Sequence, residues 1–538
     1  MNRRISIWLP LIIAVALVMG IFLGAYLPKS GPVDGVLPIR SITGHYDKLS
    51  QILRYIQSEY VDTVDMDELM DESIVNLLSE LDPHCYYIPA DELAATSEPL
   101  EGNFEGIGIE FNIQEDTIVV VAPISGGPSD LLGILPGDRI VDIEGKKAAG
   151  VGITNQDVMD KLRGEGGTKV SVKIYRHGHK DLLPFTITRG EIPLYSVDVA
   201  FMVNANTGYI KISRFARNTY DEFIEAVDKL KPQGMKQLIL DLRGNPGGYL
   251  DAATLICDEF LSRDKLIVYT EGKARPRTPY FATARGSFEK QPLIILIDEG
   301  SASASEIVAG AVQDNDRGTI IGRTSFGKGL VQEESRFPDG SAIRLTIARY
   351  YTPTGRCIQR PYNKGIKAYY EDLYSRSDIH GGGQDSIPAS DTTQKFTTPG
   401  GKVVYGGGGI RPDIFIPVDT AGYSSYLNKL ITEGVINQFC FHYADVHRKE
   451  LEKNYTAETF KLNFQVTGAV KDEFIRYTTE KGVPYNGTGW EESGQWISLR
   501  VKAGIGRQIW REMGFYPVLL EDDPVFLKAR ELSTETIN

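Results

Sequence analysis

Two different periodicities divide the first part of the chain. Over residues 43–100, apolar positions such as Leu49 and Ile52 recur three and four residues apart, which predicts amphipathic helices. From Ile107 onward, apolar and polar residues alternate instead, as they do in a half-buried strand, and turn residues separate several such segments. Residues 101–190 are therefore predicted to form a compact, strand-rich unit that contains one or two helices.

The region from 191 to 370 alternates between strand and helix patterns. Short apolar runs of the kind that is buried on both faces lie at 237–242, 266–269, 293–297 and 319–321. Helical patterns at 249–261 and 304–314 separate some of these runs, and Thr219 with Glu222 matches a capping box for a further helix. This alternation predicts α/β layers around a largely parallel sheet.

The N-terminus carries an apolar run that is long enough to cross a membrane. Arg3 and Arg4 precede an uncharged segment from Ile5 to Leu27, whose 23 residues span about 35 Å as a helix, against about 30 Å for the hydrocarbon core. The basic flank predicts a cytoplasmic N-terminus. We therefore expect residues 1–30 to form the signal-anchor helix of a single-pass inner-membrane protein, with the rest of the chain on the periplasmic side. A cleaved signal peptide is the alternative interpretation.

Composition narrows the class of protein further. A chain of 538 residues is too long for one hydrophobic core and predicts three or four domains. The net charge of −13 argues against a nucleic-acid partner, because such proteins need a basic surface for phosphates. The four cysteines are far apart, without a CxxC pair, and are predicted to be buried thiols, with disulfides as the alternative: Cys85, Cys257, Cys357 and Cys440.

The distribution of histidines restricts the chemistry of the α/β region. No histidine lies between His179 and His380, so a Ser-His-Asp triad, a Cys-His pair or a histidine-ligated zinc site cannot be built from within it. His177 and His179 are most simply part of a solvated turn. If the region is hydrolytic, we expect its general base to be a lysine or a carboxylate.

Two small-residue segments follow predicted buried strands. The segment 241–248, Asp-Leu-Arg-Gly-Asn-Pro-Gly-Gly, forms either a tight turn or a turn whose N–H groups stabilise an oxyanion. In the second, at 300–306, Ser303 and Glu306 match a capping box, so Ser303 is explained as a helix cap. A serine between a strand and a helix is also where a nucleophile is exposed, and both interpretations stay open.

A third segment contains most of a phosphate-binding pattern. Gly322, Gly327 and Lys328 fit GxxxxGK, but Gly329 stands where a Ser or Thr would hold Mg²⁺. The residues from Val331 onward have the pattern of a strand rather than of a long helix. ATP binding is therefore not predicted for this segment.

Together these segments resemble the carboxyl-terminal processing protease family. The resemblance rests on LDPHCYYIP (81–89), DLRGNPGG (241–248), SASASEIVAGAVQD (301–314) and GRTSFGKGLVQ (322–332), and it covers residues from about 43 to 418. It implies a multidomain α/β fold, with a crotonase-like α/β serine protease core, an upstream PDZ domain and a helical N-terminal module. The implied domains are the anchor at 1–30, the helical module at 43–100, the PDZ domain at 101–190, the protease core at 191–370, a loop and closing strand at 371–418 and an extension of unknown role at 419–538.

The resemblance also implies a role for individual residues. Ser303 is the nucleophile, Lys328 is the general base 25 residues later, and Gln332 orients the lysine. The implied oxyanion hole uses the N–H of Ala304 and one glycine N–H, from Gly247 or Gly248. Asp314 matches a supporting acidic position. The remaining implied residues form the carboxylate-binding loop of the PDZ domain: Gly106, Ile107, Gly108 and Ile109.

The expected function is that of a serine endopeptidase. It would cleave extracytoplasmic proteins, selected by the PDZ domain through apolar C-terminal residues, by way of an acyl-enzyme and without metal or cofactor. A lysine has a pKa of about 10.4 in water and must be desolvated to act as a base, and Phe326, Leu330 and Val331 could provide the apolar surroundings. A PDZ-based scaffold without activity and an acyl-CoA enzyme are the alternatives. An adaptor or a homo-oligomer is left open, and Cys85 and the C-terminal extension depart from the family pattern.

Overall fold

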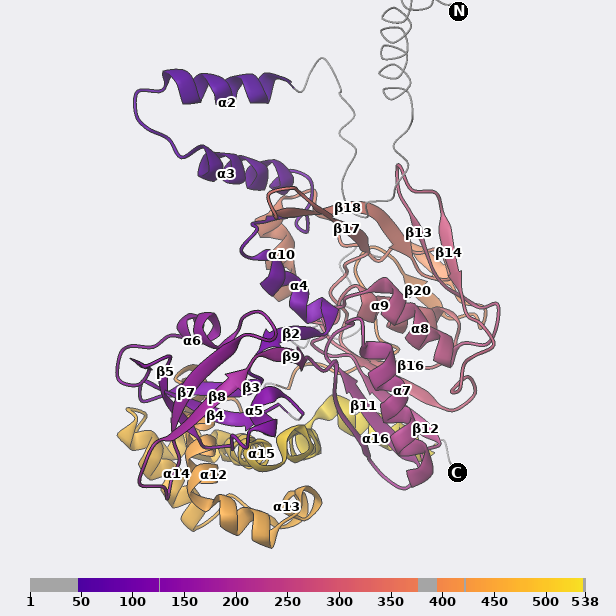
Figure 1. The fold of residues 1–538 in the computed structure, drawn as a ribbon. Helices are drawn as coiled ribbons and strands as arrows, with labels where there is room; N and C mark the ends of the chain where they lie inside the picture. Colours follow the sequence, from indigo (N-terminus) through magenta and orange to yellow (C-terminus); the bar gives the residue numbers. More distant parts are fainter. Residues whose placement is uncertain (1–46, 125, 376–393, 420–421, 536–538) are drawn as a thin grey trace, which may run out of the picture.

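The computed structural model describes residues 47–535, apart from 125, 376–393 and 420–421. Figure 1 shows a PDZ-like unit and a larger α/β unit side by side, with a helical extension beneath the first and a helical hairpin projecting above. The hairpin consists of α2 (Asp47–Glu59) and α3 (Met66–Ser79). A short strand, β1 (Tyr86–Ile88), and α4 (Leu93–Glu101) complete the N-terminal module.

A six-stranded sheet forms the centre of the α/β unit. Its order is β10-β11-β12-β15-β16-β21, and all neighbours are parallel except β10 and β11. The strands are β10 (Val197–Met202), β11 (Thr207–Ile212), β12 (Gln237–Asp241), β15 (Leu293–Ile297), β16 (Thr319–Gly322) and β21 (Ile414–Phe415). The prediction of a largely parallel sheet is therefore confirmed.

Helices cover both faces of this sheet. Leu238 and Leu240 of β12 point to one face, where they pack with α7 (Thr219–Leu230), α8 (Leu250–Phe260) and α9 (Ala304–Asp314). Ile239 points to the other face, because successive side chains of a strand alternate, and it joins a core that includes Phe526 of α16 (Pro524–Glu535). The last helix of the chain thus completes the core of the α/β unit.

A second, antiparallel sheet stands beside the first. It contains β13 (Leu266–Glu271), β14 (Thr278–Phe281), β17 (Leu330–Arg336) and β18 (Ala342–Tyr351). β1 of the N-terminal module pairs with β18, with Tyr86 opposite Arg344 and Ile88 opposite Ala342. The segment just before β1 is therefore carried into the α/β unit. The remaining elements before the extension are α10 (Ile366–Ser375) and a hairpin of β19 (Lys395–Thr397) and β20 (Val403–Tyr405).

The PDZ-like unit has a sheet of order β3-β4-β5-β7-β8 around its own apolar core. Its elements are β2 (Asn103–Gly106), β3 (Ile109–Gln114), β4 (Thr117–Pro123), α5 (Pro128–Leu131), β5 (Arg139–Ile143), β6 (Lys146–Lys147), α6 (Asn155–Leu162), β7 (Lys169–Tyr175), β8 (Leu183–Thr188) and β9 (Gly190–Pro193). Because β3 is the last strand in this order, one of its edges lacks a partner strand in the described part of the chain.

Across the described residues 422–535 the regular structure of the extension is helical. The extension contains α11 (Ser425–Thr432), α12 (Val435–Asn454), α13 (Ala457–Asn463), α14 (Ala469–Glu480) and α15 (Gly487–Leu519) before α16. It contacts the PDZ-like unit through ion pairs of Asp445 with Arg139 and of Lys481 with Glu115, both at 3.1 Å. The extension therefore packs on both the PDZ-like unit and the central sheet (Figure 1).

Two sequence-based expectations need correction here. The N-cap of α7 is Asn218 rather than Thr219, because the Thr219 hydroxyl accepts the N–H of Ala216 instead of capping the helix.

The inner-membrane, single-pass localisation is also corrected. Across residues 47–535, with the gaps given above, the structure contains no helix both long and apolar enough to cross a bilayer. The Ile5–Leu27 run behind that prediction lies outside the described residues.

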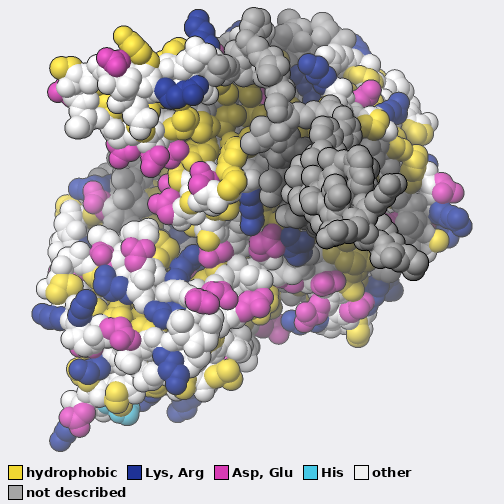
Figure 2. Space-filling model, turned by 45° about the horizontal axis from the view of Figure 1, so that its top comes forward, with side chains coloured by type: hydrophobic (Ala, Val, Ile, Leu, Met, Phe, Trp, Pro, Cys, Tyr) yellow, Lys and Arg dark blue, Asp and Glu magenta, His cyan; other side chains and the backbone are white. Residues whose placement is uncertain are grey.

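The α2–α3 hairpin carries several exposed apolar side chains. Leu49, Ile52 and Tyr55 of α2 are 48%, 46% and 69% exposed. Figure 2 shows hydrophobic side chains gathered beside this hairpin, on the face turned toward the viewer. The helical periodicity that predicted these helices is present, but this apolar stripe is not packed into a core in the described structure.

Candidate active site

Ser303 stands at the turn between β15 and α9, where it is the N-cap residue of the helix. Its backbone has φ 53° and ψ −112°, a conformation that a residue with a side chain adopts only under strain. Such a turn lifts a serine out of the sheet and exposes it at a helix N-terminus, which is a suitable place for a nucleophile. The buried Tyr350 hydroxyl donates to the Ser303 carbonyl oxygen at 3.1 Å and helps to hold this conformation.

The carboxylate of Glu306 lies fully buried between the turn that carries Ser303 and the loop that carries Lys328. One oxygen accepts the N–H groups of Ser303 (2.8 Å) and Lys328 (2.9 Å). The other accepts the Ser325 hydroxyl (2.5 Å) and the Gly327 N–H (2.7 Å). The two segments that the resemblance singled out are thus joined through one side chain. Glu306 supplies the carboxylate half of the predicted capping box and also binds a second segment.

Lys328 precedes β17 and is partly buried. Its Nζ donates to Gln332 Oε1 at 2.8 Å, which agrees with the predicted orienting role of Gln332. Burial lowers the pKa of Lys328, and the positive charge of Arg344 lowers it further, whereas Asp82 and Glu306 oppose the shift. No hydrogen bond joins the side chains of Ser303 and Lys328 in the described structure; in the absence of substrate such contacts are often long.

His84 is a site residue that the sequence analysis missed. Its carbonyl oxygen accepts the Gln332 Nε2–H, so the N-terminal module fixes the residue that orients the lysine. Its ring nitrogen Nε2 lies 3.0 Å from the Tyr369 hydroxyl, and burial together with the charge of Lys328 lowers the pKa of His84 to about 4. The ring is therefore neutral near pH 7. In the sequence, His84 was marked only by its place in the 81–89 segment, one of the four segments on which the family resemblance rests.

Gly247 of the 241–248 turn lies against Ser303 and Ala304. A Cβ on Gly247 would come within 2.7 Å of Ser303 Cβ and 2.9 Å of the Ala304 nitrogen. The Gly247 N–H donates to Asn245 Oδ1 at 2.8 Å and is already used. The N–H groups of Gly248 and Ala304, in contrast, have no acceptor among the described residues. Of the two predicted glycines, Gly248 is therefore the one with an available donor.

A charged network anchors the start of the same turn. Asp241 is buried and accepts hydrogen bonds from Arg243 and from the Tyr209 hydroxyl. Burial alone would raise the pKa of Asp241, but Arg243 and Lys211 lower it, so the carboxylate is ionised. Arg243 also pairs with Asp523 of the C-terminal extension at 2.6 Å. The extension thus reaches the segment that carries the candidate oxyanion hole.

Asp314 is separated from these residues by the length of α9. It lies at the last position of the helix, about 16 Å along the axis from Ser303. Its carboxylate forms a fully buried ion pair with Arg356 at 2.7 Å and accepts the Thr354 hydroxyl. The structure thus gives Asp314 contacts that hold α9 in place, and does not bring it to Ser303.

The predicted carboxylate-binding loop of the PDZ-like unit precedes the free edge of β3. The carbonyl oxygen of Ile107 accepts the Ser129 N–H and hydroxyl, and that of Gly108 accepts the Ile124 N–H. The N–H groups of Ile107 and Gly108 have no acceptor in the part of the chain that is described. Gly108 has φ 74°, which favours glycine. Ile107 is only 2% exposed and belongs to the core, so of the two isoleucines only Ile109 is partly accessible.

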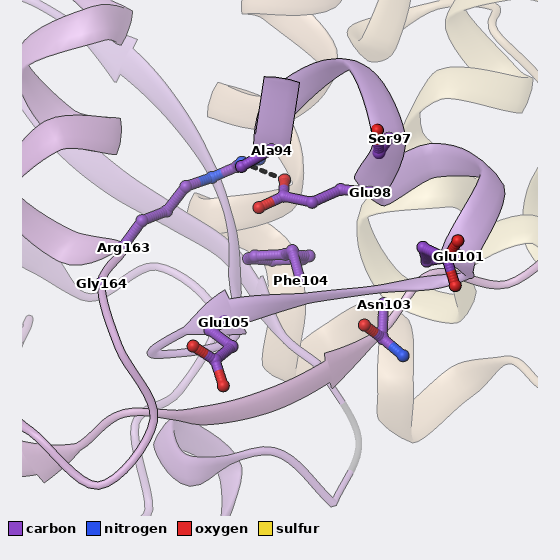
Figure 3. A pocket seen from close by; sticks show the side chains of 9 residues that line it. All are labelled: Ala94, Ser97, Glu98, Glu101, Asn103, Phe104, Glu105, Arg163 and Gly164. Carbon is purple, nitrogen blue, oxygen red and sulfur yellow. Dashed lines mark hydrogen bonds and ion pairs between the residues drawn. The ribbon is translucent and has the colours of Figure 1, made fainter. Parts of the chain in front are cut away.

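A cavity of about 390 Å³ lies where α4 meets β2 and the end of α6. Figure 3 shows Glu98 of α4 paired with Arg163 above the ring of Phe104. The lining of this cavity contains one arginine and three glutamates, Glu98, Glu101 and Glu105. None of the candidate catalytic residues lines the cavity. It marks the contact of the N-terminal module with the PDZ-like unit and is separate from the site around Ser303.

All four cysteines are free thiols, as the first interpretation of the sequence predicted. Cys85, Cys257 and Cys440 are buried, whereas Cys357 is partly exposed. Cys85 Sγ donates to Asp82 Oδ2 at 3.0 Å within the turn that positions His84. Cys85 therefore occupies a place for a small hydrogen-bonding residue.

A serine at a strained strand-to-helix turn, joined by a buried carboxylate to a desolvated lysine, defines a serine hydrolase of the α/β class. Residues 206–371 match peptidase family S41, residues 106–186 match the PDZ domain, and residues 426–511 match a family of unknown function. The chain belongs to the carboxy-terminal processing proteases of peptidase family S41, which are serine proteases with a PDZ domain.

Relatives and a solved structure give the extent of this similarity. The chain is 37% identical to carboxy-terminal processing protease CtpB of Bacillus subtilis, over 60% of this chain and 66% of that protein. It is 36% identical to the carboxy-terminal-processing protease of Bartonella bacilliformis, over 64% and 79% of the two chains. The solved photosystem II D1 C-terminal processing protease is 29% identical over 59% and 84%, with a TM-score of 0.35.

Proposed function

We propose that this protein cleaves peptide bonds with a serine–lysine dyad formed by Ser303 and Lys328. The observation that carries the proposal is the arrangement of the lysine. Lys328 is desolvated, its Nζ is oriented by Gln332, and its backbone shares the carboxylate of Glu306 with the backbone of Ser303. A scaffold or an acyl-CoA enzyme has no use for a lysine with a lowered pKa beside a serine, so these alternatives are disfavoured.

The proposed mechanism begins with neutral Lys328. Its Nζ takes the proton of the Ser303 hydroxyl, and Ser303 Oγ attacks the peptide carbonyl carbon. The N–H groups of Ala304 and Gly248 stabilise the oxyanion that forms, since both lack another acceptor in the described structure. The ammonium of Lys328 then protonates the leaving amine, and a water molecule hydrolyses the acyl-enzyme with the lysine again as base.

Two substitutions of the lysine separate a base from a fixed positive charge. Lys328→Arg retains the charge but cannot lose its proton, so we expect it to be as inactive as Lys328→Ala and Ser303→Ala, with kcat at least about 1,000-fold lower. Ser301→Ala is the matched control, because that hydroxyl donates to the Leu242 carbonyl within the turn and is not a candidate nucleophile. Substantial activity in Lys328→Arg would exclude the lysine as base.

We further propose that the PDZ domain selects substrates by their free C-terminus. The unused N–H groups of Ile107 and Gly108 and the free edge of β3 support this proposal, because a terminal carboxylate and an added strand need such donors. Partly accessible Ile109 favours an apolar terminal residue. A peptide with an apolar free C-terminus should have a KM at least about tenfold below that of its amidated form; equal values would contradict the proposal.

A further inference from the structure

Glu306 is a shared hydrogen-bonding partner of the turn that carries Ser303 and the loop that carries Lys328. These two segments are also joined directly by the Phe326 N–H and the Ser301 carbonyl oxygen. Its two carboxylate oxygens accept four hydrogen bonds, two from the backbone of the dyad residues and two from Ser325 and Gly327. We propose that Glu306 is a positioning residue of the reaction, which sets the position of Ser303 relative to Lys328. This inference rests on the proposed serine–lysine function, and it assigns to Glu306 a task beyond that of a helix cap.

The chemistry of the four partners explains why a carboxylate occupies this position. All four are donors, and an ionised carboxylate is an acceptor on both oxygens. Glutamine has nearly the same shape, but its NH₂ group would face two N–H or O–H donors. Aspartate is shorter by one methylene group and cannot reach both segments from α9. Glu306 is fully buried, and burial raises the pKa of its carboxyl, whereas the four hydrogen bonds oppose that shift and stabilise the ionised form.

The connection matters because neither segment is held rigidly by regular structure alone. Ser303 has a strained backbone, and Lys328 lies in a loop between β16 and β17. Displacing one reacting group by about 1 Å can reduce a rate about 100-fold. Loss of the shared carboxylate should therefore lower kcat, while substrate binding by more distant residues, and thus KM, should change little.

The charge of Glu306 has a second, separable effect. The charged and titratable groups that act on Lys328 are Arg344, Asp82, Glu306 and His84, and the two carboxylates stabilise the ammonium form. Glu306 itself faces Tyr350, Cys357 and Tyr369, which are neutral near pH 7. Removal of its negative charge should lower the pKa of Lys328. The rise of the rate with pH would then move to lower pH, although the plateau is reduced.

The test compares the Glu306→Gln variant with the parent enzyme, both as the full-length chain, on one peptide substrate between pH 5 and 10. We expect a plateau kcat lower by about 100-fold, a KM within about threefold, and a rate profile displaced to lower pH. Glu259→Gln is the matched control, because Glu259 of α8 is also buried and also accepts hydrogen bonds from two other segments. Its donors are the Tyr220 hydroxyl of α7 and the Ser287 N–H of the loop between β14 and β15, both at 2.8 Å. It should keep both kcat and the pH profile of the parent.

A milder variant decides the question if Glu306→Gln does not fold. Ser325→Ala removes one of the four donors, together with the acceptor of the Ile410 N–H, and leaves the charge of Glu306. We expect kcat to fall by about tenfold with KM retained. The inference is overturned if folded Glu306→Gln, or Ser325→Ala in its place, keeps the parent kcat, or if Glu306→Gln loses activity without displacement of the pH profile. An active Ser303→Ala would instead overturn the proposed function, so the two failures are distinguishable.

Discussion

Arg344 offers a sensitive test of how the protein lowers the pKa of its lysine. Burial is the main cause of the lowered pKa of Lys328, and the positive charge of Arg344 is the next. Removal of that charge in Arg344→Gln should raise the pKa of Lys328. In the proposed mechanism the neutral lysine is the active form, so the rise of the rate with pH should move to higher pH, while the plateau at alkaline pH stays the same.

The size of this effect follows from simple electrostatics. Below the plateau, the rate in the proposed mechanism is proportional to the fraction of Lys328 that is neutral. For a lysine with its free pKa of about 10.4, this fraction is only about 0.1% at pH 7.5. A change of about 1.4 kcal/mol in the stability of the ammonium form changes that neutral fraction tenfold. Arg344 also pairs with Glu334 at 3.1 Å, which offsets part of its field. We therefore expect a loss of roughly threefold below the plateau.

The assay is the pH dependence of kcat/KM on a fluorogenic peptide, measured at constant ionic strength because salt screens such effects. Arg336→Gln is the matched control: Arg336 also pairs with Glu334, at 3.2 Å, but is not among the groups that shift the pKa of Lys328. His84, with a pKa of about 4, should add no step near pH 6.5. A loss that is equal at every pH, or a displacement to lower pH, would refute the reasoning.

Three further predictions concern residues around the site. Gly248→Ala would place a Cβ 2.0 Å from the Phe215 carbonyl oxygen, and kcat should fall at least about 100-fold in peptide cleavage; normal cleavage would remove Gly248 from the oxyanion hole. Asp314→Asn leaves the buried Arg356 charge without its partner and should lower the free energy of unfolding by about 3–5 kcal/mol, with kcat retained in the folded fraction. Loss of kcat without loss of stability would make Asp314 part of the reaction. Phe526→Ala should destabilise the enzyme by about 3–5 kcal/mol in denaturant titrations, because it opens the core beneath the central sheet; an unchanged midpoint would mean that α16 is dispensable.

Local patterns were sufficient for much of the architecture. Buried runs such as 237–242 and 293–297 became β12 and β15, and the helical pattern at 304–314 became α9, because strand and helix periods appear directly in the order of apolar residues. The family resemblance, the α/β class and the PDZ domain are confirmed by the matches to known families. The roles of individual site residues remain predictions that the substitutions above test.

Errors arose where a distant contact competes with a local one. Thr219 and Glu222 have the spacing of a capping box, yet Glu222 accepts the N–H groups of Ser196 and Val197 across a long loop. The helices of the extension, whose sequence contains no recognised motif, bury aromatic and β-branched residues in a core of their own. In the first case tertiary packing overrides a weak local preference.

By itself the sequence determined which residues are candidates for the chemistry and where they lie along the chain: a serine between a strand and a helix, a lysine 25 residues later, and no histidine between them. Only the tertiary structure decided which groups surround them. The pairing of β1 with β18 brings the carbonyl of His84 to Gln332. The fold of the 241–248 turn leaves the N–H of Gly248, rather than that of Gly247, available. Helix α16 covers one face of the central sheet. Such contacts join residues far apart in the chain and depend on backbone dihedrals, so they leave no periodic signal in the sequence.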